Sequence, residues 1–264
     1  RYFDTGVEQV DFSSPKAAAA VNAWVATSTR GAVRRLLPVA LPSLTDLLLT
    51  DAVHFSARWA PEVDFLPSLE TRGSFVTAGG ARVPVTMMRL QSGSLAYVST
   101  SGLQAVVLPY AGERFEAVAV EATRGALSSL VDGLGPAELT RLAHSAHVGA
   151  VNLAIPKFSI SSEANLDGVL QAVGVAGAFG LGADYRGMTA ALGITLQAVD
   201  QADSLTVDEF GTDTSSVSGV RTGQTSQHGH IETISFDHPF LFVIRDVATG
   251  AIVSDAIVAD PRQA

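Results

Sequence analysis

Short apolar or alternating runs, separated by Gly and Ser, fill the middle of the chain. They read ARVPVTMMRL, SLAYVST, LQAVVLPYAG and FEAVAVEA between residues 81 and 122. Alternation with a period of two is typical of half-buried strands, and closely spaced strands of this kind predict an antiparallel sheet or barrel. VNLAIPKFSI and GITLQAVDQADSLTVDEF predict two further strands, and HPFLFVIRD with AIVSDAIV predicts a closing hairpin. The chain must therefore be rich in β-structure.

Helices are expected at three places. Ser13 and Ser14 followed by Pro15 favour a helix start, and Gly31 suits its end. In that helix Ala18, Val21, Trp24 and Val25 share one face. Residues 126–147 are helical up to a glycine and again after a proline, and residues 164–180 predict a helix with a glycine-rich end.

Two further segments are interpreted as strands. Residues 44–59, LTDLLLTDAVHFSARW, predict one long buried strand, and the opening residues 1–15 resemble a strand already under way. No repeat or low-complexity linker divides the chain. Together these elements predict a single α+β domain over residues 1–264, with helices set against the sheets.

Composition excludes several classes of function. The net charge is -9, which disfavours a nucleic-acid or anionic-lipid surface. No apolar run reaches the roughly 18 residues that a membrane span requires. Cysteine is absent, which removes disulfides, thiol nucleophiles and cysteine-zinc sites but does not fix the compartment.

Catalytic and metal-binding signals are weak. The sequence has no G-x-S-x-G elbow, P-loop or G-x-G-x-x-G, and its carboxylates are scattered singly. His144 and His147 lie three apart on an expected helix, but without a carboxylate partner we interpret them as surface histidines. His228 and His230 are interpreted as solvated loop residues. We expect no enzyme, no metal and no cofactor.

A long polar stretch near the end of the chain is unusual for a compact domain. Residues 207–230 read VDEFGTDTSSVSGVRTGQTSQHGH and carry almost no large side chain. Structureless loops longer than about 12–15 residues are usually functional or disordered. After Gly211, the alternate positions Thr212, Thr214, Ser216 and Ser218 are small hydroxyl residues. In a strand they would share one face, so this segment could fit between two other strands as well as form a loop.

Several motifs, in order, resemble the serpin family of serine protease inhibitors. VNAWVATSTRGAVRRLL is similar to the family's helix F signature, which places that region at 13–31, and LLLTDAVHFSARW to the strand after it. VPVTMMR, LPY, IPKFSI and ADYRGMT follow in the family's order, and DHPFLFVIRDVATGAIVSDAIVADP is similar to the closing strands, 234–261. The resemblance implies a serpin fold of mixed sheets, helices and an exposed reactive-centre loop. The family's first third has no counterpart, so we expect a fragment of a longer, bacterial-type protein.

The resemblance assigns the polar stretch to the hinge and reactive-centre loop, about residues 208–233. It implies a hinge formed by Glu209, Gly211, Thr212, Thr214, Ser216 and Ser218. Counting from the hinge glycine places the scissile bond at Thr225–Ser226. The hinge departs from the family in two ways: TDTSSVS replaces a run of alanines, and Phe210 replaces a polar residue.

The resemblance also implies residues that control opening of the central sheet. Lys157 matches a lysine that pairs with the hinge glutamate, and Trp59 would pack close by. Asp51 and Gln201 stand where the family has an asparagine and a histidine that gate the sheet. A buried Asp without a partner would be costly there.

The implied function is inhibition of a serine-type protease by a suicide-substrate mechanism. The small polar residue before the scissile bond favours an elastase-like or subtilisin-like target over a trypsin-like one. We expect a monomer that acts outside the cell, as is the family habit. Two alternatives remain: a non-inhibitory serpin-fold protein that binds a ligand or partner, and a fragment that is inactive alone.

Overall fold

A computed structural model describes residues 8–31, 33–37, 45–123, 127–191, 193–213 and 230–262. By its internal contacts the chain divides into two compact units, residues 1–54 with 161–204, and residues 55–160 with 205–264. Strands β8 (Phe158–Asn165) and β9 (Leu196–Asp208) run through both. The expectation of one domain therefore stays a prediction.

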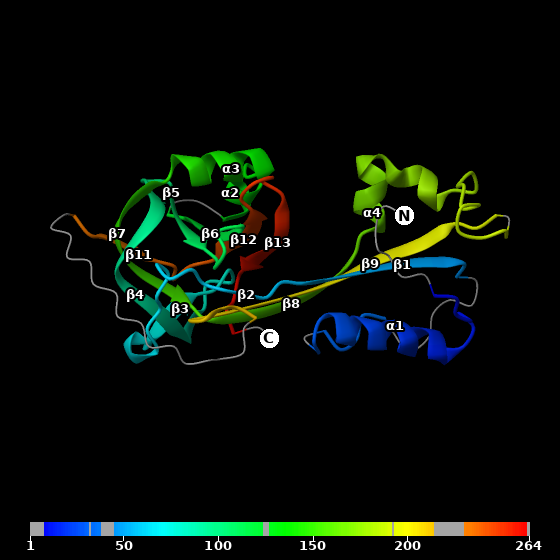
Figure 1. Cartoon of the computed structure of the whole chain (residues 1–264), viewed down its shortest axis with the longest axis horizontal. Coiled ribbons are helices and arrows are strands. Elements are labelled where there is room, and N and C mark those ends of the chain that lie inside the picture. Colours follow the sequence, from blue (N-terminus) through cyan, green and yellow to red (C-terminus); the bar gives the residue numbers. More distant parts are fainter. Residues whose placement is uncertain are drawn as a thin grey trace. The chain divides into compact units, whose positions relative to one another are not determined.

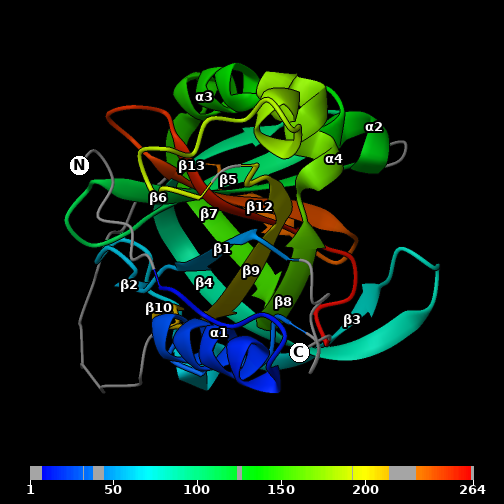
Figure 2. The same cartoon turned by 90° about the vertical axis from the view of Figure 1, so that its right-hand side faces the viewer.

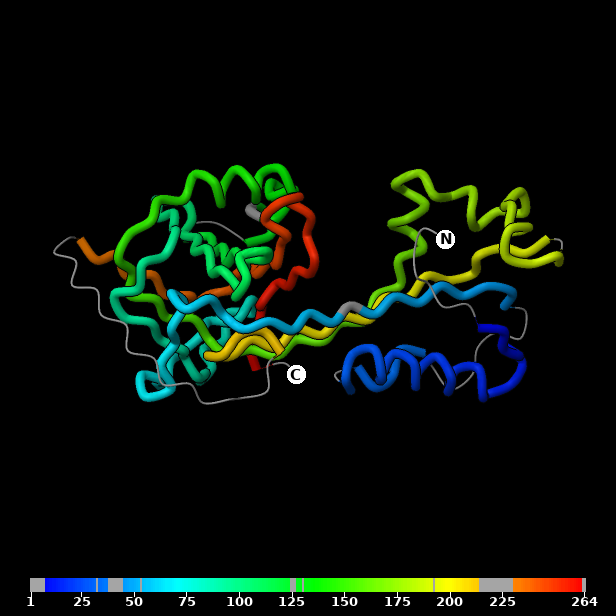
Figure 3. Tube along the Cα trace, viewed as in Figure 1, coloured from blue at the N-terminus to red at the C-terminus, as the bar shows by residue number. Residues whose placement is uncertain are grey.

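The first unit contains helix α1 (Pro15–Ser28) and strand β1 (Leu47–His54), which pairs in parallel with β9. Helix α4 (Asp167–Leu170) continues into a π-helical turn and a 3-10 turn, which span Gln171–Val175 and Ala176–Phe179. Figures 1 and 2 show α1 and α4 on opposite sides of the β1–β9 pair. The tube in Figure 3 follows β1, β9 and β8 side by side.

The predicted start and end of α1 are confirmed. The Ser14 hydroxyl accepts a hydrogen bond from the backbone N–H of Lys16 at 3.3 Å, and Pro15 opens the helix. Gly31 follows the helix with φ +85°, a conformation that favours glycine. Of the expected apolar face, Ala18 and Val25 are buried, whereas Trp24 is 46% exposed.

Side chains of the family-like helix motif hold the chain that leaves α1. The Asn22 Oδ1 accepts hydrogen bonds from the backbone N–H groups of Leu36 and Leu37, both at 2.8 Å. The buried Thr29 hydroxyl donates to Val25 O at 2.8 Å and accepts from the Val33 N–H at 3.0 Å. Val25 and Val33 pack with Ala202 of β9, which seats the helix on the β1–β9 pair.

The second unit is built on an eight-stranded sheet in the order β11-β7-β4-β5-β6-β12-β13, with β3 paired to β4. Its neighbours are antiparallel except β11 and β7, which are parallel. These strands are β3 (Thr71–Val76), β4 (Arg82–Ser99), β5 (Leu103–Pro109), β6 (Phe115–Ala122), β7 (His147–Pro156), β11 (Glu232–Ser235), β12 (Phe240–Asp246) and β13 (Ile252–Val258).

The core of this unit is apolar on both faces of the central strands. One cluster contains Phe75, Met88, Tyr110, Phe236 and Phe242 among its buried members. The other packs under helices α2 (Leu127–Val131) and α3 (Pro136–Ser145), which lie over β5 and β6 in Figure 1. Every residue of β12 is buried, as its nearly continuous apolar sequence predicts.

Several local predictions were wrong. The described part of the opening segment, residues 8–14, is not a strand. Residues 44–59 do not form one buried strand: β1 has no buried side chain among those described, Leu49 is 46% exposed, and the strand breaks before β2 (Ala57–Arg58). The expected helix at 164–180 is interrupted at Gly174, whose φ is +102°.

The histidine pair also differs from expectation. Helix α3 ends at Ser145, so His144 and His147 do not share a helix. His147 opens β7, and its ring lies 4.0 Å from that of Tyr97. No helix in the described part of the chain is long and apolar enough to cross a membrane.

Candidate functional site

The start of the polar stretch lies within a sheet. Strand β10 (Gly211–Thr212) pairs antiparallel with β9 on one side and with β2 on the other. Gly211 stands opposite both Asp208 and Arg58. The Asp213 N–H donates to Thr206 O at 2.8 Å, which extends the β9 contact by one residue. The first residues after the turn at the end of β9 therefore occupy a strand position between β9 and β2.

Gly211 is required by this close approach. Its φ is +149°, and a Cβ at this position would lie 2.1 Å from the carbonyl oxygen of Ala57. A residue with a side chain would meet both backbone strain and a clash with main-chain atoms, which cannot move aside easily. The glycine predicted as the hinge is thus a position where only glycine fits the observed pairing.

Thr212 is buried next to two stacked aromatic rings. Its side chain has 0% exposure, and its hydroxyl lies 2.5 Å from the Tyr110 hydroxyl. Burial raises the pKa of Tyr110, against a smaller opposing effect of Thr212, so the phenol stays protonated. The Tyr110 ring stacks on that of Trp59, with centroids 4.6 Å apart.

Trp59 contacts both sides of the turn between β9 and β10. Its indole Nε1 donates to Asp208 O at 2.9 Å, and its backbone N–H donates to Phe210 O at 3.1 Å. The expectation that Trp59 packs close to the hinge matches this position. Phe210, noted as a departure from the family, contributes its carbonyl to this contact.

Lys157 forms ion pairs with two carboxylates beside the same turn. Its Nζ lies 2.5 Å from Glu209 and 2.5 Å from Glu70. Glu209 has a side chain only 9% exposed. Burial would raise the pKa of Glu209, but the contacts with Lys157, its own backbone amide and Glu70 together lower it. Burial likewise opposes the charge of Lys157, but the two glutamates raise its pKa.

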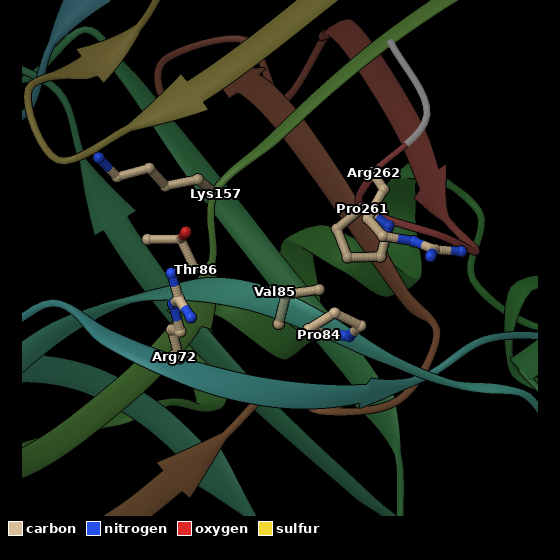
Figure 4. Close-up of a pocket in the computed structure, with 7 residues that line it drawn as sticks. All are labelled: Arg72, Pro84, Val85, Thr86, Lys157, Pro261 and Arg262. Atoms are coloured by element: carbon tan, nitrogen blue, oxygen red, sulfur yellow. The ribbon is translucent and has the colours of Figure 1, made fainter.

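A pocket of about 440 Å³ adjoins Lys157, lined also by Arg72, Thr86 and Arg262. Figure 4 shows the charged ends of Lys157 and Arg262 pointing away from one another. Lys157 is engaged by Glu70 and Glu209, and Arg262 pairs with Asp260 at 2.7 Å. These cations do not converge on the pocket, so they do not form an anion site there.

Asp51 and Gln201 lie opposite each other on the parallel strands β1 and β9. The Gln201 amide donates to Asp203 at 3.1 Å, two residues along its own strand. Asp51 is exposed, so the expected cost of a buried carboxylate does not arise in this structure. The structure brings the two positions together without a hydrogen bond recorded between their side chains.

Other predicted site residues lie outside the described residues. These are the remaining hinge positions Thr214, Ser216 and Ser218 and the scissile pair Thr225 and Ser226. The structure describes the chain again from His230, and strand β11, which follows, pairs in parallel with β7.

Sequence reasoning missed two members of the site. Tyr110 belongs to the LPY motif, but nothing in the motif shows that its hydroxyl reaches Thr212 across 102 positions. Glu70 precedes β3, a strand that was not predicted, and it contacts Lys157 together with Glu209. A single glutamate outside any motif, such as Glu70, gives no sequence signal for a contact with Lys157.

Comparison with known proteins gives the class of this fold. The profile of the family "Serpin (serine protease inhibitor)" matches residues 1–261. An uncharacterised serpin-like protein of Thermococcus kodakarensis is 29% identical over 97% of this chain and 59% of its own length. Serpin B13 of Homo sapiens is 29% identical over 96% of this chain and 66% of its own length.

A solved structure agrees with the sequence comparison. Thyroxine-binding globulin in complex with thyroxine superposes with a TM-score of 0.85 at 26% identity, covering 99% of this chain and 69% of that one. The chain therefore has the serpin fold and belongs to the serpin family. It spans 59–66% of the length of the two curated relatives named above.

Proposed function

We propose that this chain is part of a serine protease inhibitor that acts as a suicide substrate. The observation that carries the proposal is the position of Gly211 and Thr212, which already pair as a strand between β9 and β2. When a protease cleaves such a loop, its next residues can continue the strand that its first residues already form in the sheet. The family membership supports inhibition in general.

The proposed reaction uses the protease's own chemistry. The protease serine attacks the carbonyl of Thr225, the amine of Ser226 leaves, and an acyl-enzyme forms. The cleaved loop then continues β10 as a strand, with Thr214, Ser216 and Ser218 on the face that Thr212 occupies. The linked protease is carried along and deformed before water can hydrolyse the ester. In this proposal the inhibitor supplies no catalytic residue.

Insertion requires existing contacts to separate. β1 pairs with β9 over Leu47–His54, so a strand that enters beyond Asp213 must take partners that β1 now holds. The contacts of Lys157, Trp59 and Tyr110 hold the turn and the residue from which this exchange would begin. We propose that they, together with the Asp51 and Gln201 positions, set how readily the sheet opens.

The remaining assignments follow from the family and from the loop sequence. We propose an extracellular, monomeric protein that targets an elastase-like or subtilisin-like serine protease, because Thr225 is small and uncharged. The binding of thyroxine by thyroxine-binding globulin supports a second candidate, a serpin-fold protein that binds a ligand without trapping a protease.

The test uses the complete protein that contains residues 1–264. It is mixed with a subtilisin-type and an elastase-type protease, and the products are analysed on a denaturing gel and by thermal melts. A covalent band that survives denaturation, with a large rise in melting temperature after cleavage, is the expected result. Cleavage near Thr225 with no covalent band and an unchanged melt would overturn the trapping mechanism and favour the binding protein.

A further inference from the structure

Glu121 is a buried carboxylate whose hydrogen bonds are incomplete. It lies near the end of β6, and the residue is 4% exposed. Its Oε1 accepts a hydrogen bond from Gln104 Nε2 at 3.2 Å, and the same amide donates to Ser235 O at 2.7 Å. Its Oε2 is buried and has no hydrogen-bond partner among the described residues. A buried polar oxygen without a hydrogen-bond partner is costly, so its position favours a bound ligand.

Asp237 and His238 place two further donor groups beside this carboxylate. One donor atom from each of the three side chains lies within 4.8 Å of the others. The His238 Nδ1 is 2.7 Å from Asp237 Oδ1 and 4.0 Å from Glu121 Oε1. Two ligand atoms at about 2.0–2.1 Å from a tetrahedral zinc ion lie roughly 3.3 Å apart. The observed distances bracket that value, so small side-chain rotations would complete the geometry.

The charges of the cluster also favour a cation. Two carboxylates in this position repel one another, and a divalent ion between them would replace repulsion with attraction. The half-exposed His238 gives an ion access from solvent.

We propose that Glu121, Asp237 and His238 bind one divalent transition-metal ion, for which Zn²⁺ fits the donor set best. Imidazole and carboxylate together suit zinc, whereas calcium prefers oxygen ligands alone and in larger number. With three protein ligands a fourth position stays open. The cluster borders a pocket of about 770 Å³, lined also by Thr77, Ser128 and Ile257, in which water or a small anion could complete the coordination.

The ion would join two parts of the second unit. Glu121 belongs to β6, whereas Asp237 and His238 precede β12 and follow β11, the strand to which the chain returns after the polar stretch. Gln104 already connects Glu121 to Ser235 of β11. Metal binding would therefore stabilise the segment that anchors the far end of that stretch, and it does not depend on the proposed inhibitory function.

The test is calorimetric titration of the complete, chelator-treated protein with ZnCl₂ alone and with CaCl₂ alone, together with thermal melts. We expect one Zn²⁺ per chain, a raised melting temperature, and no comparable binding of Ca²⁺. Glu121→Gln and His238→Ala should each weaken Zn²⁺ binding by about tenfold or more, because even outer partners of a metal site contribute about 10–100-fold.

His230→Ala is the matched control, since His230 also contacts a carboxylate, Glu232 at 3.1 Å, but does not belong to the cluster. It should bind Zn²⁺ as the wild type does. If Glu121→Gln fails to fold, His238→Ala still tests the metal site, because His238 is half-exposed and its replacement should not unfold the protein. Absence of Zn²⁺ binding, or binding that His238→Ala leaves unchanged, would overturn the proposal.

Discussion

At the scale of single residues, Glu209 and Glu70 both pair with Lys157, but we expect their removal to affect the hinge differently. Glu209 belongs to the turn that precedes β10, whereas Glu70 precedes β3 and reaches this turn only with its side chain. Glu209→Gln should therefore loosen the hinge and lower the free energy of unfolding by about 1–2 kcal/mol. This value lies between the cost of losing an exposed ion pair and that of breaking a fully buried one. Faster hydrogen exchange at the Asp213 amide, which donates to Thr206, would report the loosening.

Glu70→Gln is the matched control for that change. It removes the other half of the Lys157 contact and should lower stability without speeding exchange at the Asp213 amide. Equal exchange rates in the two variants would show that the Glu209 contact does not hold the hinge.

The same ion pair gives a pH dependence with a defined sign. The pKa of Glu209 lies below its ordinary value of 4.5 in the folded chain, so its contribution to stability is complete above that pH and is lost as the pH falls through the folded pKa. The pKa of Lys157 lies above 10.5, so its contribution is lost only in strong alkali. The stability gap between wild type and Glu209→Gln should be constant from about pH 6 to 9 and should shrink as the pH falls below the ordinary glutamate pKa of 4.5. Urea unfolding at these values measures it, and an unchanged gap in acid would contradict the assignment.

Gly211 gives the sharpest structural prediction at this scale. Gly211→Ala places a Cβ against the Ala57 carbonyl at a positive φ, so β10 should leave its position between β9 and β2. We expect loss of protection at the Asp213 amide and a lower melting temperature, since strain of this kind costs about 1–3 kcal/mol before any clash. Gly102→Ala, where a Cβ would meet nothing within 4 Å, should change neither; a similar loss there would contradict the explanation.

At the scale of elements, the strands were predictable where apolar alternation was strong and flanked by turns. β5, β6, β12 and β13 fall close to their predicted positions because each is a short apolar run; β5, β6 and β12 are continuously buried along most of their length. β1 was mispredicted as buried, since LLL is apolar in sequence while Leu49 is exposed in the structure. The resemblance led us to expect Gly211, Trp59 and the Lys157–Glu209 contact close together, because short motifs carry these residues; their roles in the hinge and in sheet opening stay predictions. The Tyr110–Thr212 contact and the Glu121 cluster join residues more than 100 positions apart, and no local pattern encodes them.

The face of the inserting strand can be tested by two adjacent substitutions. Thr212 is buried, so in a strand that continues β10 Ser216 shares its face and Ser215 faces away. Ser216→Arg should abolish the covalent complex while leaving cleavage intact, because a buried unpaired charge opposes insertion by several kcal/mol. Ser215→Arg should keep the complex. Identical behaviour of the two variants on the denaturing gel would exclude insertion in this register.

At the scale of the whole molecule, the two units differ in how much apolar surface they bury. Among the described residues, the second unit contains two buried clusters, whereas the first has one small cluster around Val25, Val33 and Ala202. Within the first unit Leu49, Val173 and Leu181 are exposed to 46%, 70% and 90%. Local opening is easiest where few apolar contacts must break, so stability should not be uniform along residues 1–264.

Hydrogen exchange of the 264-residue chain can measure this difference on two strands of equal length. β1 and β6 each have eight residues, but β1 ends its sheet among the described strands, whereas β6 lies between β5 and β12 and is largely buried. Amides of β1 should exchange at least about tenfold faster than those of β6, a difference of about 1.4 kcal/mol in opening free energy. Equal protection of the two strands would mean that the chain opens as one cooperative unit, and that β1 cannot separate from β9 without global unfolding. Insertion of the loop would then require more than local opening, and the proposed mechanism would lose its first step.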